Sequence, residues 1–149
     1  MEFRVEQAVD LFQNGGLNCS QAMLSVYGEK QGLDKSIAVK VASVLGGGMG
    51  RLGKTCGAVT GAFLALGLSY QLDDPQARDK VYALVREFAR RFESRNGSIS
   101  CRDLLGNDIS TEVGADRIKE LQLTKLLCPK YVKDAAEIME EMLDELQST

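Results

Sequence analysis

The stretch Leu45–Tyr70, LGGGMGRLGKTCGAVTGAFLALGLSY, constrains the fold most, because it joins a glycine-rich loop to an uncharged segment. Glycine occupies positions 46–48, 50 and 53, where it permits backbone conformations that other residues rarely adopt. Small residues then recur at Gly57, Gly61 and Ala65 and share one helix face, which another helix can approach closely. We therefore expect a sharply turning loop that leads into a tightly packed helix, with Cys56 at the junction.

Apolar residues recur at helical spacing through most of the remaining sequence. The pattern predicts helices over 2–14, 19–31, 35–45, 55–71, 75–95, 112–123 and 129–147, and a short helix from Cys101 to Leu105. In the 35–45 segment we expect Ile37, Val41 and Val44 to face inward, although its valines also fit a strand. The prediction is an all-α, single-domain helical bundle of about six or seven helices over residues 1–149.

Charge and hydropathy exclude several classes of partner. The net charge is −3 and no block of basic residues forms a patch, so we expect no nucleic-acid partner. The uncharged run 55–72 approaches the length of a membrane span, but its glycines and polar residues favour a buried helix, so we expect no membrane insertion. The charged N-terminus does not resemble a signal peptide, so we expect a cytoplasmic protein.

Met139 and Met142 fit either a core or a dimer surface, so the sequence leaves open whether the protein forms a homodimer.

The sequence contains no histidine, which limits the chemistry that it can perform. Ser-His-Asp and Cys-His catalysis are both excluded. The commonest transition-metal ligand is also missing, so a metal site would have to use cysteine, carboxylate or backbone oxygen ligands.

The glycine loop also matches two nucleotide-binding motifs. Residues 48–55 fit the phosphate-binding pattern G-x-x-x-x-G-K-[ST], and Gly48, Gly50 and Gly53 fit the dinucleotide fingerprint. Both motifs require several parallel strands with crossover helices, and no buried-strand pattern follows Asn96. Nucleotide binding by this loop is therefore the third and weakest hypothesis.

The four cysteines, Cys19, Cys56, Cys101 and Cys128, are widely spaced and form no Cys-x-x-Cys pair. This spacing excludes the usual thioredoxin motif and the zinc ribbon. Each cysteine lies within one turn of a predicted helix N-terminus, where backbone N–H groups and partial positive charge favour the thiolate.

The most specific of these predictions concerns the pKa of Cys56. The small residues after it should leave its sulfur unshielded, and Lys54 and Arg51 lie just upstream. We therefore expect a Cys56 pKa below the ~8.5 of free cysteine, unless burial against Val59 and Phe63 opposes the charge effect.

The order and surroundings of the cysteines also resemble a known family, the C-GCAxxG-C-C family of redox-active four-cysteine proteins. The matching residues are Asn18-Cys19-Ser20-Gln21-Ala22, Cys56-Gly57-Ala58-Val59-Thr60-Gly61, Cys101, and Cys128-Pro129 with Tyr131-Val132. The resemblance covers nearly the whole chain and implies an all-helical protein whose four cysteines are the functional residues. A related domain occurs in split-Soret cytochromes, where an iron–sulfur centre has been proposed. The resemblance does not imply haem binding by this chain, because the sequence has no Cys-x-x-Cys-His site.

Two functional hypotheses follow. In the first, the four cysteines either hold an iron–sulfur cluster or zinc, or cycle as thiol/disulfide pairs with a redox partner that the sequence does not identify. Gly57 and Gly61 would then provide close packing beside the site, and Lys54 would balance its negative charge. In the second, the chain is a helical binding or scaffold protein with incidental cysteines. We expect the four cysteines to cluster: four sulfurs around one small site would favour a metal, two separate close pairs would favour disulfide exchange, and scattered sulfurs would exclude both.

Overall fold

The computed structural model describes residues 2–148, and its regular elements are helices, which confirms the all-α prediction. They are α1 (Glu2–Gln13), α2 (Cys19–Lys30), α3 (Lys35–Ala42), the 3₁₀ turn η1 (Ser43–Leu45), α4 (Gly46–Met49), α5 (Gly57–Gly67), α6 (Ala77–Asn96), α7 (Cys101–Leu105), α8 (Glu112–Glu120) and α9 (Leu123–Ser148). Over the described range β-type pairing is limited to an isolated bridge between Thr55 and Ser100. The glycine loop therefore follows α3 and η1 rather than a strand, and lacks the strand–loop–helix context that a phosphate-binding loop requires.

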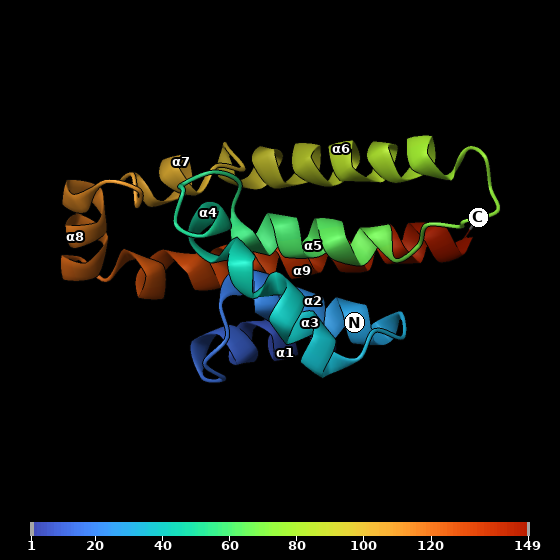
Figure 1. Ribbon diagram of the computed structural model, residues 1–149, viewed down its shortest axis with the longest axis horizontal. Helices are drawn as coiled ribbons and strands as arrows, with labels where there is room; N and C mark the ends of the chain where they lie inside the picture. The colour runs from blue at the N-terminus through green and yellow to red at the C-terminus, as the bar shows by residue number, and fades with distance from the viewer. Residues whose placement is uncertain (1, 149) are drawn as a thin grey trace.

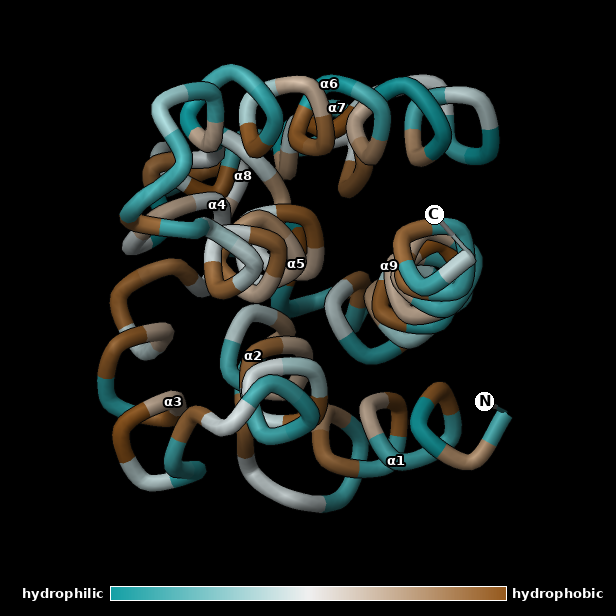
Figure 2. The backbone as a smooth tube through the Cα atoms, turned by 90° about the vertical axis from the view of Figure 1, so that its right-hand side faces the viewer, coloured by the Kyte–Doolittle hydropathy of each residue, from teal (hydrophilic) through white to brown (hydrophobic). Residues whose placement is uncertain are grey.

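Helix α5 lies at the centre of the bundle, with α6 on one side, α2 on the opposite side and α9 flanking it (Figure 2). Its small residues permit this position. A Cβ atom on Gly61 would lie 2.7 Å from the Ser20 carbonyl oxygen and 2.9 Å from the Met23 Cβ. The backbones of α2 and α5 are thus in direct contact, as the spacing of small residues predicts.

Gly61→Leu should test this contact. We expect it to lower the free energy of unfolding by about 1–3 kcal/mol, because the new side chain meets the α2 backbone rather than a flexible side chain. Gly67→Leu is the matched control on the same helix, since, apart from the adjacent residues and the nearby backbone of α5, no heavy atom of residues 2–148 lies within 4 Å of a Cβ placed there. Urea unfolding of both variants gives the comparison, and equal midpoints would show that the α2–α5 contact tolerates a side chain.

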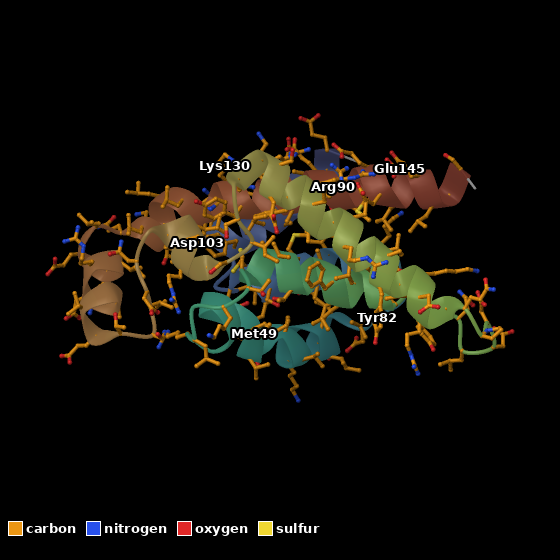
Figure 3. All side chains as sticks on the ribbon, turned by 90° about the horizontal axis from the view of Figure 1, so that it is seen from above. Met49, Tyr82, Arg90, Asp103, Lys130 and Glu145 are labelled. Carbon is orange, nitrogen blue, oxygen red and sulfur yellow. The ribbon has the colours of Figure 1, made fainter. Side chains whose placement is uncertain are left out.

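The two longest helices, α6 and α9, are joined along their exposed edge by ion pairs. Arg91 contacts Glu145 at 2.8 Å, and Arg95 contacts Glu137 at 2.9 Å and Glu141 at 3.0 Å. In Figure 3, the labelled side chains of Arg90 and Glu145 show where α6 and α9 lie alongside each other. At the other side of α9, both oxygens of the Glu140 carboxylate accept hydrogen bonds from Arg4, at 2.6 and 2.8 Å, which fastens α1 to α9. None of the helices within residues 2–148 is long and apolar enough to cross a membrane.

The inward face predicted for α3 is wrong. Ile37, Val41 and Val44 are exposed by 50%, 51% and 66%, whereas Ala38 and Ala42 are fully buried. The alanines allow α3 to lie close to α2, and the larger side chains consequently point to solvent. Met139 and Met142, in contrast, are buried in the core and are not part of a dimer surface.

The chain path brings several helix ends together. Helices α2, α5 and α9 all begin at the same end of the molecule, where α4 and α7 also lie (Figure 1). All four cysteines are at this end, because Cys19, Cys56 and Cys101 start or cap α2, α5 and α7, and Cys128 lies near the start of α9.

Candidate functional site

A short backbone bridge places Cys56 beside Cys101. The Cys56 N–H donates to the Ile99 carbonyl at 2.7 Å, and the Cys101 N–H donates to the Lys54 carbonyl at 2.6 Å. These bonds flank the antiparallel bridge between the segments just before α5 and α7. Two cysteines that are far apart in the sequence are therefore held side by side at the starts of two helices.

Cys19 is positioned by the capping box that the sequence predicts. The Asn18 side chain accepts a hydrogen bond from the Gln21 N–H at 2.8 Å, and the Gln21 side chain accepts one from the Asn18 N–H at 2.9 Å. These bonds fix Cys19 as the first residue of α2. A Cβ atom on Gly57 would lie 2.7 Å from the Cys19 sulfur, so the glycine after Cys56 makes room for the other thiol.

The glycine loop folds as a left-handed turn against Cys101. Five consecutive residues, 47–51, have positive φ angles of 65°, 67°, 69°, 61° and 65°, and two of them, Met49 and Arg51, are not glycine. Met49 lies at the outer edge of the molecule (Figure 3). At the inner side, a Cβ on Gly48 would lie 2.7 Å from the Cys101 Cβ and 2.6 Å from the Lys54 nitrogen. The turn therefore forms a close-fitting wall over the cysteines.

Cys128 is the cysteine whose predicted position is wrong. Helix α9 begins at Leu123, so Cys128 lies in its second turn rather than at its N-terminus. Pro129 is within the helix, where its missing N–H leaves the usual i−4 bond to Lys125 unmade. Tyr131, one turn further along, donates its hydroxyl hydrogen bond to the Leu104 carbonyl at 2.7 Å and ties α9 to α7.

All four cysteines line one cavity of about 90 Å³, so the convergence expected from the sequence is present. The rest of its lining comprises Phe12, Asn18, Gly47, Gly48, Gly57, Leu104, Leu105, Ile109, Thr124 and Tyr131. Cys56 and Cys101 are 6% and 8% exposed, whereas Cys19 and Cys128 are half-buried. All four are free thiols.

Cys19 is the thiol whose surroundings favour the thiolate. A hydrogen bond with the Cys56 thiol lowers the Cys19 pKa the most, and burial opposes it. The backbone N–H groups of Cys19, Ser20 and Ala58 also hydrogen bond to the Cys19 sulfur and lower its pKa further. The free N–H groups at the start of a helix thus favour a thiolate, as expected for this type of position.

Cys56 has the opposite shift, so the low pKa predicted for it is wrong. Its hydrogen bond with Cys19 raises its pKa the most, followed by burial and by the negative charge on Cys19. The Ala58 N–H lowers the Cys56 pKa, but the same N–H also acts on Cys19, which is the more exposed of the two. Of two neighbouring thiols, the one whose sulfur accepts more N–H hydrogen bonds loses its proton first. Cys19 therefore becomes the thiolate, and Cys56 stays protonated.

Lys54 contributes to the site through its backbone rather than its charge. Its N–H donates to the Gly48 carbonyl at 2.9 Å and its carbonyl accepts from Cys101. The Lys54 side chain is exposed and its charge acts on Asp108, whose pKa is lowered chiefly by hydrogen bonds from Ser110. Lys54 therefore does not explain the ionisation of either Cys19 or Cys56.

Cys101 and Cys128 remain protonated at neutral pH. Burial raises the pKa of Cys101 to about 11, with smaller contributions from the charges of Cys19 and Asp108. Burial also raises the pKa of Cys128 to about 12, and the charges of Cys19 and Cys101 add to it. The cavity therefore combines one thiol that ionises readily with three that do not.

The other lining residues were not predictable as a set. Tyr131 follows Cys128 by three residues and so shares its helix face, which is a pattern that the sequence does contain. Phe12, Ile109 and Thr124 reach the cavity from separate elements, and nothing in their local sequence indicates this.

Comparison with known proteins agrees with this geometry. The family model described as "Putative redox-active protein (C_GCAxxG_C_C)" matches residues 17–142, which is most of the chain. The chain belongs to this family. The matched range contains all four cysteines, and in this C_GCAxxG_C_C protein the Gly57 of the central motif provides the space for the Cys19 sulfur. No curated protein and no solved structure gives a match to the chain.

Proposed function

We propose that this family member is a thiol–disulfide redox protein in which Cys19 and Cys56 form the reactive pair. The observation that carries the proposal is that the Cys19 sulfur lies against Gly57, the residue after Cys56, in a cavity lined by all four cysteines. A disulfide forms between cysteines whose Cα atoms lie about 4.4–6.8 Å apart, so the proposal requires that spacing between Cys19 and Cys56.

The two cysteines would have different roles. Cys19 is half-buried and carries the hydrogen bonds that stabilise a thiolate, so it is the sulfur that reacts with an external oxidant or disulfide. Cys56 is almost fully buried beside it and retains its proton, so it reacts second and closes the disulfide. Closing the disulfide releases two electrons and two protons to the acceptor.

Cys101 and Cys128 would act as a second, slower pair. Both line the same cavity, and the raised pKa values of both keep them as thiols at neutral pH. A thiol attacks a disulfide only through its small thiolate fraction, so exchange with the Cys19–Cys56 disulfide would be slow.

A metal or iron–sulfur centre is a second candidate, favoured by the convergence of four thiols on one cavity. Thiolates are the ligands that such clusters and structural zinc prefer, so the donor set fits chemically. Within residues 2–148, however, no three histidine, cysteine, aspartate or glutamate side chains are grouped so that they could hold an ion. Cys19, Cys56, Cys101 and Cys128 would be the ligands, and an iron–sulfur cluster would supply one-electron transfer.

The experiment is a redox titration of the anaerobically purified protein in thiol/disulfide buffers, followed by alkylation and peptide mapping. The expected result is one two-electron transition that links Cys19 to Cys56 and leaves Cys101 and Cys128 alkylated. Iron with acid-labile sulfide in the same preparation, with all four thiols protected from alkylation, would instead support the cluster. Four thiols that stay reduced in every buffer would contradict both candidates and support a scaffold.

A further inference from the structure

The size of the four-cysteine cavity limits what can reach Cys19. At about 90 Å³ it has room for only a few water-sized molecules. A peroxide, with two oxygen atoms, fits in this space, whereas a peptide disulfide would have to reach Cys19 from outside the cavity. Resting on the thiol–disulfide function above, we infer that the oxidant of the Cys19–Cys56 pair is a small, neutral hydroperoxide.

The lining of the cavity supports a neutral oxidant. Phe12, Leu104, Leu105 and Ile109 give its wall an apolar part. Moving a charged group into such surroundings costs far more free energy than moving a neutral one, unless a counter-charge is present. Within residues 2–148, no charged side chain lines this cavity. Carboxylate-bearing oxidants such as glutathione disulfide are therefore disfavoured by charge as well as by size.

The route from solvent also fits a small reagent. An open surface groove of about 710 Å³ runs beside the cavity and shares three lining residues with it, Phe12, Asn18 and Thr124. The groove is much larger than the cavity, so the cavity rather than the groove sets the size limit. Phe12 is the largest of the three shared side chains, so its truncation would widen the boundary between groove and cavity more than that of either other residue.

The reaction balances without another co-reactant. The Cys19 thiolate attacks one oxygen of H₂O₂, the O–O bond breaks, and the second oxygen leaves as hydroxide, which takes a proton from solvent to become water. Cys19 is thereby oxidised by two electrons to the sulfenic acid. The Cys56 sulfur then attacks Cys19, the S–O bond breaks, and the hydroxyl leaves with the Cys56 proton as a second water. The product is the Cys19–Cys56 disulfide.

Stopped-flow kinetics on the reduced full-length protein tests this inference. We expect H₂O₂ to oxidise the protein on the order of a hundredfold faster than it oxidises free cysteine, the effect that one well-placed backbone donor has at other sites. Glutathione disulfide and cumene hydroperoxide should react no faster than with free cysteine. Cys56→Ser should stop at a sulfenic acid on Cys19 that dimedone traps, and Cys19→Ser should form none.

Phe12→Ala provides a second test that keeps the cysteines intact. Widening the boundary between groove and cavity should accelerate oxidation by cumene hydroperoxide and leave the H₂O₂ rate nearly unchanged, with circular dichroism confirming that the variant is folded. Wild-type protein that reacts with H₂O₂ no faster than free cysteine, or equally fast with glutathione disulfide, would overturn the inference. In that case a Cys19–Cys56 disulfide in thiol buffers would still support the proposed function, whereas its absence would remove both.

Discussion

Replacing Gly48 by alanine is expected to lower the free energy of unfolding by about 2–4 kcal/mol, the largest stability effect that we predict for a single substitution. Two costs add. Gly48 has a φ angle of +67°, which costs an alanine about 1–2 kcal/mol. The new Cβ would also lie 2.6 Å from the Lys54 nitrogen and 2.9 Å from the Gly53 carbonyl carbon, neither of which can rotate away.

Gly97→Ala separates these two costs. Gly97 ends α6 with a φ angle of +82°, but no heavy atom in the described part of the chain lies within 4 Å of a Cβ placed there. This control should therefore lose only the backbone part, about 1–2 kcal/mol. Urea unfolding measures both variants. If Gly48→Ala is no less stable than Gly97→Ala, the left-handed turn is not packed against Cys101 as described.

Cys19→Ser should have the largest effect on reactivity. Iodoacetamide reacts with thiolates, and only Cys19 has a pKa lowered by its surroundings, first by the hydrogen bond with Cys56. We expect the fast phase of alkylation at pH 7 to disappear, with the total rate falling by at least about tenfold, because burial raises the pKa of Cys101 to about 11 and that of Cys128 to about 12.

Cys101→Ser is the matched control, because it removes a thiol of the same cavity whose pKa is raised to about 11 by burial. The fast phase should persist in this variant. A fast phase that survives Cys19→Ser and disappears in another cysteine variant would show that the reactive thiol has been assigned to the wrong residue.

The sequence predicts the parts of this fold that depend on neighbouring residues. The capping box of Asn18 and Gln21 correctly starts α2 at Cys19, and the Asn96–Gly97 pair correctly ends α6. Local hydrogen bonds decide these boundaries, and the residues that make them are adjacent in the chain. The small residues of α5 also predict its close contact with another helix.

The errors arise where distant elements decide the outcome. The proline after Cys128 is typical of a helix start, yet α9 begins at Leu123 and Pro129 lies within it. The ionisation of Cys56 depends on Cys19, which α2 brings into contact from outside its local sequence. The apolar stripe of α3 predicts an inward face, but the alanines allow the closer contact with α2.

The left-handed turn at 47–51 is predictable from the sequence only in part. Glycines at most of its positions permit positive φ angles, so a sharp turn is predictable from the sequence. The wall that this turn forms against Cys101 is not predictable, because it depends on the bridge between Thr55 and Ser100.

The most direct test of the account is the alkylation rate of each cysteine against pH, measured by mass spectrometry on the reduced, metal-free protein. A lowered pKa means that the thiolate forms at lower pH, so the Cys19 rate should rise at a pH below that of free cysteine. The half-points of Cys101 and Cys128 should lie near 11 and 12, and that of Cys56 should also lie above the ordinary value. A profile in which Cys56 titrates first, or in which all four cysteines titrate like free cysteine, would contradict the assignment of Cys19 as the reactive thiol.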